Sequence, residues 1–482
     1  MTWLHDQRWR CLGLAIVVGS ILTAATPPHV VVILVDDMGY GDLGSYNADS
    51  RIPTPQLDRL AADGMRFTDA HAAGALCHPS RYGLMTGQLP FRIDYSKWPR
   101  ERLIDEDRST LASMLRTQGY RTAMVGKWHL GFDEDGYDQP LPGGPVDVGF
   151  DSFFGIRAST DIPPYFYIRD DRAILPPDSE IGANQSGPPW NRIQGAFWRE
   201  GGISSDLDLE AVLPRFTDEA VAIIESHAGK RTNDPLFLYL AYPAPHTPWL
   251  PTSEFQGATN NLYGDFMVMV DHMIGRVFRA LEKSGMADDT LVIFTSDNGP
   301  VWYAKDFAAF DHDSAGGLRG MKGDAYEGGH RMPFVVRWPG EVPVGSVSDR
   351  LICFTDVFAT LAELTGYELS DHDAPDSFSF LPTLRGEAQA ERGPLLLLSA
   401  KRHQVLRVGG WKYIDDVGSG GFSDGFGDRY RAAEPLAGQP PAQLYHIAVD
   451  PAETINRWTD RPDIVRQLET ILHEVSTGDR TR

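Results

Sequence analysis

Oxygen-bearing side chains follow two apolar stretches of the chain at the point where each stretch ends. Asp36 and Asp37 come directly after one stretch, and Asp297 and Asn298 come after another. Adjacent carboxylates repel each other, so such a pair calls for a cation. Carboxylate and amide oxygens are hard ligands that select Ca²⁺ or Mg²⁺ over zinc or copper. The four residues therefore predict a divalent-metal site, although two unrelated turns would contain the same residue types.

Cys77 stands two residues before Pro79 in a segment with helical potential. Because proline favours the first turn of a helix, we expect Cys77 near a helix N-terminus, where free backbone N–H groups and the helix dipole attract an anion. That position suits a nucleophile that transfers an oxyanion. Arg81, one turn further on, is expected to hold the nucleophile's oxygen and to pair with the carboxylates. A buried cysteine beside a turn and a surface salt bridge are the alternatives.

Basic side chains follow further predicted strands. Lys127 and His129 come after one strand, His246 comes after another, and Lys322 lies in a glycine-rich loop. A single lysine or histidine in a loop is more often exposed than catalytic. Four such groups, together with an oxygen-rich metal site in one sheet, instead predict an active site.

The apolar pattern predicts strands and helices that alternate along the chain. Strands are expected at 29–35, 122–125, 236–241, 291–295 and 334–337, and helices after an N-cap at Ser109 and at 216–226, 267–281 and 356–364. The predicted fold is α/β, with a large, mixed, mostly parallel sheet flanked by helices. Beyond 386, short apolar runs such as 394–398 and 405–408 predict a small antiparallel subdomain.

The predicted division is a signal segment 1–25, a catalytic domain 26–386 and a C-terminal α+β subdomain 387–482. Residues 161–202 are rich in proline and aromatic residues, have little periodicity and are expected to be an insertion or a long loop.

The composition is that of a globular protein with an acidic surface. Of the 482 residues 42% are hydrophobic and 23% are charged, and the net charge is −22. Nucleic-acid binding rests on lysines and arginines that neutralise phosphates, so this charge argues against a nucleic-acid partner.

The N-terminus has the pattern of a secretory signal. Arg8 and Arg10 precede an apolar run from Cys11 to about Leu22, and small residues follow. The run is shorter than the roughly 20 residues of a membrane span, so we expect export to the periplasm or medium with no transmembrane anchor after cleavage. Cleavage would leave two cysteines and no disulfide framework.

The chain resembles the type I sulfatases of the alkaline-phosphatase-like superfamily, from Val31 to about Asn456. The run 77–87 carries the family's Cys-x-Pro-Ser-Arg core with His78 at the variable position, and the segments 327–334, 444–445 and 450–453 also resemble family segments. The resemblance implies that a maturation enzyme oxidises Cys77 to formylglycine. It further implies that Asp36, Asp37, Asp297, Asn298 and the modified residue 77 bind a divalent metal, usually Ca²⁺ and alternatively Mg²⁺.

The resemblance also implies roles for Arg81, Lys127, His129, His246 and Lys322, which match the remaining active-site positions. The hydrated aldehyde would attack sulfur with one hydroxyl, and His129 would take a proton from the other as sulfate leaves. His246 or Lys322 would neutralise the leaving oxygen, while Lys127 and the metal would hold sulfate oxygens. Two rival readings are a phosphonate monoester hydrolase or phosphodiesterase of the same superfamily, and an unmatured glycan-binding protein.

The substrate is expected to be a sulfate ester, with sulfated carbohydrates preferred over small aryl or alkyl esters. Arg157 or Arg169 could meet a second anionic group of the substrate. Six aromatic residues could form a platform for a sugar ring, although core packing explains most of them more simply; they are Tyr165, Phe166, Tyr167, Trp190, Trp198 and Trp302.

Overall fold

The computed structural model describes residues 27–191, 193–230, 234–424 and 439–482. The predicted signal segment lies outside these residues, as does Cys11. Among the described residues, no helix has both the length and the apolar character needed to cross a membrane.

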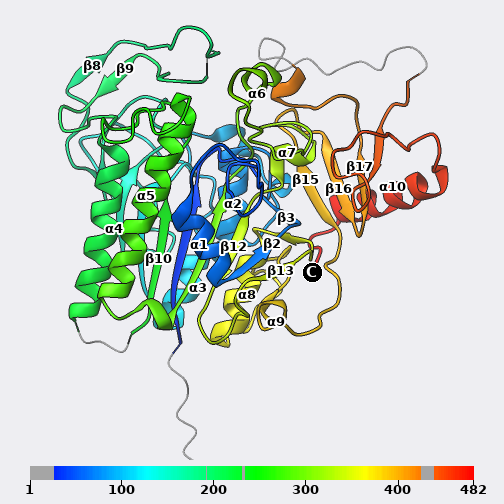
Figure 1. Cartoon of the computed structure of the whole chain (residues 1–482). Coiled ribbons are helices and arrows are strands. Elements are labelled where there is room, and N and C mark those ends of the chain that lie inside the picture. The colour runs from blue at the N-terminus through cyan, green and yellow to red at the C-terminus, as the bar shows by residue number, and fades with distance from the viewer. Residues whose placement is uncertain (1–26, 192, 231–233, 425–438) are drawn as a thin grey trace, which may run out of the picture.

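Ten strands form one large sheet (Figure 1). They are β1 (His29–Val35), β2 (Met65–Phe67), β4 (Arg121–Lys127), β5 (Ser152–Ile156), β6 (Ile168–Arg169), β7 (Arg172–Ala173), β10 (Leu236–Ala241), β11 (Thr290–Ser296), β12 (Phe334–Arg337) and β13 (Ser346–Ser348). Their order is β13-β2-β12-β11-β1-β10-β4-β5-β6-β7. The central strands β11, β1, β10, β4 and β5 are parallel, whereas β12 is antiparallel to both neighbours. The sheet is therefore mixed and mostly parallel, which confirms the predicted fold class.

Helices cover both faces of this sheet. The helices α1 (Pro55–Asp63), α4 (Val212–Gly229) and α5 (Leu262–Lys283) pack on one face, and α2 (Cys77–Thr86), α3 (Leu111–Thr117) and α8 (Asp356–Thr365) pack on the other. Consecutive residues of β1 therefore enter different cores: Val32 packs with the second group of helices and Ile33 with the first. A strand covered on both faces needs a nearly continuous apolar sequence, and the run 29–35 was predicted to be a strand for this reason.

A small antiparallel sheet follows the large one in the chain, as the sequence predicts. It contains β15 (Leu395–Leu398), β16 (Gln404–Val408), β17 (Trp411–Ile414) and β18 (Gln443–His446). The helix α10 (Pro462–Thr477) buries Leu468 and Leu472 against Leu396 and Leu406 of this sheet. Figure 1 shows this unit in orange and red beside the main sheet. The remaining elements include β3 (Ala70–His71), β8 (Ser179–Ile181), β9 (Gly201–Ile203), β14 (Ile352–Cys353), α6 (Ala304–Phe310), α7 (Glu327–His330) and α9 (Leu381–Leu384).

Several predicted elements are longer in the structure, since α4, α5 and β11 each extend beyond the predicted 216–226, 267–281 and 291–295. Two further differences, in α3 and β4, have a clear physical cause. The N-cap of α3 is Thr110 rather than Ser109, because Thr110 and Ser113 form a reciprocal capping box. The strand β4 continues beyond residue 125 through Gly126, whose φ of 117° and close approach to the Ala241 carbonyl exclude a side chain. Lys127 is therefore the last residue of the strand rather than the start of a loop.

The segment 161–202 contains short strands where the sequence predicts an insertion or long loop. β6 and β7 form a hairpin at the edge of the large sheet, and β8 pairs with β9. Each of these strands has only two or three residues. A strand this short is below the length at which alternation can be recognised in a sequence.

A buried group of charges joins the small sheet to the helix α7. Lys412 on β17 lies 3.0 Å from Glu327 on α7 and 2.8 Å from Glu453, and all three side chains are buried. Together with His71, the side chains of Glu327 and His330 lie close enough to hold a metal ion. The Lys412 ammonium, 3.2 Å from His330 Nε2, already supplies the positive charge there.

Replacing Lys412 with methionine is expected to destabilise the protein. Removing one partner of a buried ion pair leaves the other uncompensated, at a cost of about 3–5 kcal/mol. The exposed pair Arg461–Asp463 offers a control, because solvent screens such a pair and Arg461→Ala should change the free energy of unfolding little. Denaturant unfolding followed by circular dichroism measures both. Equal stability of K412M and the wild type would contradict a stabilising role for this contact.

Candidate active site

The carboxyl ends of β1 and β11 bring the predicted oxygen ligands together. These strands are parallel neighbours with Val35 opposite Ser296, so Asp36–Asp37 and Asp297–Asn298 leave the sheet side by side. The Asp37 backbone N–H donates to Asp297 Oδ1 at 3.3 Å, and Asn298 Nδ2 donates to Asp37 Oδ1 at 2.6 Å. Asp37 has a φ of 63°, so the chain turns sharply as it leaves the sheet. The two acidic segments thus share one buried site.

The chemistry of this site fits a hard cation. Asn298 Oδ1 is buried and has no hydrogen-bond partner among the described residues, which leaves a lone-pair donor free beside the carboxylates. Burial and the neighbouring charge of Asp36 raise the pKa of Asp297 to about 6. A bound cation would offset the repulsion between Asp36 and Asp297, and the Asn298 oxygen would coordinate it.

Cys77 is the first residue of α2, as its position before Pro79 predicts. Its Sγ lies 3.5 Å from Asp36 Oδ1 and 3.2 Å from Lys322 Nζ. Burial raises the pKa of the Cys77 thiol and outweighs the opposite effect of Lys127 and Lys322. The unmodified side chain is therefore a protonated thiol at neutral pH, which is a poor nucleophile.

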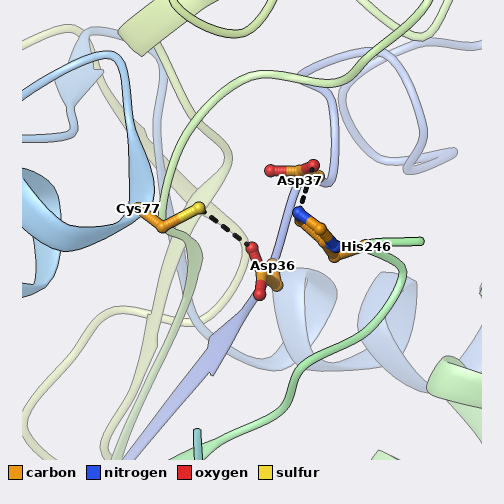
Figure 2. A group of neighbouring side chains, drawn as sticks. All are labelled: Asp36, Asp37, Cys77 and His246. Atoms are coloured by element: carbon orange, nitrogen blue, oxygen red, sulfur yellow. Dashed lines mark hydrogen bonds and ion pairs between the residues drawn. The ribbon is translucent and has the colours of Figure 1, made fainter. Parts of the chain in front are cut away.

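Side chains of Asp36, Asp37, Cys77 and His246 converge from separate segments (Figure 2). One potential ligand atom from each lies within 4.8 Å of all the others. His246 Nε2 is 3.6 Å from Asp37 Oδ2, and its Nδ1 lies 2.6 Å from the Thr247 carbonyl. Because a carbonyl only accepts hydrogen bonds, Nδ1 carries the hydrogen and Nε2 faces the acidic group.

Arg81 and Lys127 tie the helix bearing Cys77 to the acidic strand ends. Arg81 lies 2.8 Å from Asp297 Oδ2 and 3.5 Å from Asp36 Oδ2, and it donates to the Lys127 carbonyl at 3.0 Å. Lys127 Nζ forms an ion pair with Asp36. Burial alone would raise the pKa of Asp36, but Lys127, His246 and Arg81 together keep it well below its usual range.

His129 has a buried ring nitrogen that is free of hydrogen bonds within the described part of the chain. Its Nδ1 is buried without a hydrogen-bond partner among the described residues, and its φ of 62° places it in a tight turn after β4. Its ring packs 4.4 Å from Trp98, which stacks on His78. Burial, assisted by the charge of Lys127, holds the pKa of His129 well below its usual range. The imidazole is therefore neutral and able to accept a proton.

The loop that carries Lys322 is held by the C-terminal unit. Asp324 accepts hydrogen bonds from the Met321 N–H at 2.8 Å and from the Ser423 N–H at 3.1 Å. Gly323 donates to the Ala75 carbonyl, two residues before Cys77. Asp324 had no signal in the sequence, since nothing in a Gly-Asp pair indicates a partner such as Ser423, 99 residues away.

The aromatic and arginine residues considered for substrate contact mostly have other partners. Tyr165, Phe166 and Tyr167 are buried in the core, so they form no platform for a sugar. Arg157 is paired with Glu134, and Arg169 with Glu219. Trp190, Trp198 and Trp302 also lie in or against the core, and Trp190 packs on Phe310.

Two polar residues near His246 had no signal in the sequence. Asp161 lies in the loop after β5, and its Oδ1 is 3.9 Å from His246 Nδ1. Arg199, 38 positions later, forms an ion pair with Asp161. Only the folded chain reveals that these residues are neighbours of the site.

Comparisons with known proteins identify the family of this chain. The Sulfatase family model matches residues 28–367. The chain is 32% identical to N-acetylgalactosamine-6-O-sulfatase of Bacteroides thetaiotaomicron over 93% of each chain, and 33% identical to human arylsulfatase A over 93% of this chain and 86% of the relative.

A solved 6S-sulfatase described in the metabolism of multiple glycosaminoglycans by Bacteroides thetaiotaomicron superposes with a TM-score of 0.82. It is 31% identical and covers 94% of this chain and 100% of its own. With a family model that matches most of its length and relatives aligned over nearly all of it, this chain belongs to the sulfatase family and is a sulfuric ester hydrolase.

Proposed function

We propose that this protein hydrolyses sulfate esters of carbohydrates, converting R–OSO₃⁻ and water to R–OH and sulfate, with a nucleophile derived from Cys77. The observation that supports this most directly is the convergence of Cys77, an acidic oxygen cluster and His246 in one buried site. The names of the relatives, among them an N-acetylgalactosamine-6-O-sulfatase, support a carbohydrate as the sulfated molecule.

The metal of this site would be held by Asp36, Asp37, Asp297 and Asn298 together with the modified residue 77. An all-oxygen set favours Ca²⁺, with Mg²⁺ as the alternative. When bound, the ion would stabilise negative charge on the sulfate oxygens. The orphaned Asn298 oxygen is the observation that supports a ligand at this point.

Cys77 would act after oxidation to formylglycine by a maturation enzyme. The buried thiol is protonated and lacks a second group for expelling the product. The hydrated aldehyde supplies two hydroxyls, one to attack sulfur and one to release sulfate as the aldehyde re-forms. The second hydroxyl is therefore the chemical advantage of formylglycine over the thiol.

The remaining side chains would position charge and move protons. Neutral His129 would accept the proton of the second hydroxyl, and Lys127 would hold sulfate oxygens. Lys322 and His246 would face the leaving oxygen and neutralise it. Arg81 would keep the N-terminus of α2 aligned with Asp36 and Asp297 through its two contacts.

The proposal also includes export of the protein and its division into two domains. The chain would be cleaved after about residue 25 and act in the periplasm or medium, with a catalytic domain 26–386 and a C-terminal subdomain 387–482. The C-terminal subdomain would contribute to catalysis through the contact between Ser423 and Asp324.

Sulfate release from a panel of sulfated mono- and oligosaccharides tests the function. Nitrophenyl sulfate and a nitrophenyl phosphodiester serve as comparison substrates. We expect turnover of at least one sulfated sugar and slower turnover of the phosphodiester. Faster turnover of the phosphodiester than of every sulfate ester would instead favour a phosphoryl-transfer enzyme.

Asp324→Ala is expected to lower kcat/KM by about fivefold to thirtyfold, because it frees the loop that carries Lys322. The loss of the hydrogen bonds to Asp324 corresponds to about 1–2 kcal/mol. Sulfate release by D324A, K322A and the double variant measures this. If Asp324 acts through Lys322, adding D324A to K322A should cost little more. Additive losses would contradict that coupling and indicate a general structural role.

A further inference from the structure

Asp161 and Asp37 flank the two ring nitrogens of His246. Asp161 Oδ1 lies 3.9 Å from Nδ1, whereas Asp37 Oδ2 lies 3.6 Å from Nε2. The imidazole therefore separates Asp161 from the acidic cluster that would hold the metal. Since His246 would meet the leaving oxygen, the desulfated part of the substrate would lie next to this imidazole, and Asp161 is the neighbour of the imidazole on the Nδ1 side.

The Asp161 carboxylate has one oxygen engaged and one free. Oδ2 is paired with Arg199, but Oδ1 is buried and has no hydrogen-bond partner among the described residues. His246 does not fill this role, because its Nδ1 hydrogen is directed to the Thr247 carbonyl at 2.6 Å. Leaving a buried acceptor unpaired costs about 1–3 kcal/mol, so the free oxygen calls for a donor that the described residues do not supply.

Arg199 holds this carboxylate in place. One terminal nitrogen of its guanidinium contacts both Asp161 Oδ2 and, at 2.9 Å, the Asp161 carbonyl. The Tyr165 hydroxyl donates to the Arg199 carbonyl at 2.8 Å, which ties the two segments together. The side chain of Asp161 is 5% exposed, but that of Arg199 is 41% exposed. The Asp161 carboxylate is thus fixed by its contacts, whereas the Arg199 guanidinium is partly exposed to solvent.

We propose that Asp161, held by Arg199, is a specificity-determining residue that accepts a hydrogen bond from a hydroxyl of the sulfated sugar. This rests on the proposed function, since it concerns the carbohydrate released in that reaction. The free lone pairs of Oδ1 would accept the hydroxyl, while the partly exposed guanidinium of Arg199 has further N–H donors for a neighbouring sugar oxygen. Carboxylate and guanidinium together match the donor and acceptor character of adjacent hydroxyls.

The proposal predicts an effect that depends on the substrate. A hydrogen bond to a charged group is worth about 1.5–3 kcal/mol, so Asp161→Ala should lower kcat/KM for the preferred sulfated sugar by about 10- to 150-fold. Nitrophenyl sulfate has no hydroxyl for Asp161 to recognise, so its kcat/KM should change by less than about threefold. Asp171→Ala, which removes a half-exposed carboxylate on the β6–β7 turn, is the matched control and should leave both substrates unchanged.

The two substrates distinguish recognition from positioning. If Asp161 acted by orienting His246, D161A would slow both substrates equally, and that result would overturn the proposal. An unchanged rate with the sugar would overturn it as well. In both cases, sulfate release by the wild type would leave the proposed function intact.

Analogues of the sugar that lack single hydroxyls complete the test. The wild type should lose activity on the analogue that lacks the recognised hydroxyl, and D161A should lose little more on that analogue. Equal sensitivity of D161A and the wild type to every missing hydroxyl would exclude this contact. Failure of the wild type to release sulfate from any ester would overturn the proposed function and this inference together.

Discussion

Cys77→Ala is expected to abolish sulfate release while the fold is retained. Removal of a covalent nucleophile lowers turnover by about 10⁴-fold or more in enzymes that depend on one. Loss of the thiol also removes a group with only two polar contacts, to Asp36 and Lys322, so the structure has little reason to change. Sulfate release and circular dichroism measure the two expectations.

Cys77→Ser provides a sharper version of the same experiment. Serine offers one hydroxyl, which can attack sulfur, but it has no second hydroxyl for expelling sulfate. We expect a sulfated serine to accumulate on exposure to substrate and to be visible by mass spectrometry of the peptide spanning residue 77. A folded C77S protein that never acquires sulfate would count against Cys77 as the nucleophile.

Cys353→Ala is the matched control for both variants. Cys353 is buried and free like Cys77, but it lies on β14, outside the acidic cluster. Its replacement should leave sulfate release near the wild-type rate. A large loss with C353A would indicate that cysteine substitution harms the protein by disturbing its core.

Removal of divalent metal is the second change with a large expected effect. A chelator should lower turnover by about 10³-fold, because the carboxylates and the sulfate ester would then repel each other without compensation. Added Ca²⁺ or Mg²⁺ should restore activity. If Zn²⁺ alone restored it, the oxygen-ligand assignment would be wrong.

Asn298→Ala separates metal binding from other effects of chelation. It removes the buried amide oxygen that lacks a partner, so calorimetry should show weaker Ca²⁺ binding, and more Ca²⁺ should be needed for half-maximal activity. Asn260→Ala is the control, because Asn260 is exposed and lies outside the acidic cluster. Its side-chain amide donates a hydrogen bond to the Phe310 carbonyl and accepts one from the Asn261 side chain. Equal Ca²⁺ affinity of N298A and the wild type would exclude Asn298 as a ligand.

Elements that are buried on both faces could be predicted from sequence nearly to the residue. β1, β10 and β12 have the predicted bounds because the fully buried residues of a strand that is covered on both sides must be apolar. The start of α3 was missed by one residue, since Ser109 and Thr110 are both good caps. Thr110 is selected by its bonds to Ser113 and to the Val148 carbonyl, and the second of these partners is distant in sequence.

Most of the acidic and basic site residues could be singled out because they lie at or just after the end of a strand, and strand ends are visible in the sequence. Lys322 is an exception, since it lies in a glycine-rich loop. That the two acidic pairs meet depends on the register between β1 and β11, which the structure provides. Their catalytic and metal-binding roles stay predictions that the variants above would test.

The sequence by itself determined the fold class, the family and the residues able to do chemistry, because periodicity and strand-end composition are local properties of a chain. Only the tertiary structure decided which charges are already paired. Arg157 and Arg169 are neutralised by Glu134 and Glu219, whereas Asp161 keeps a free oxygen beside His246. Such pairing depends on distances between residues far apart in sequence, and those distances exist only once the segments are packed against one another.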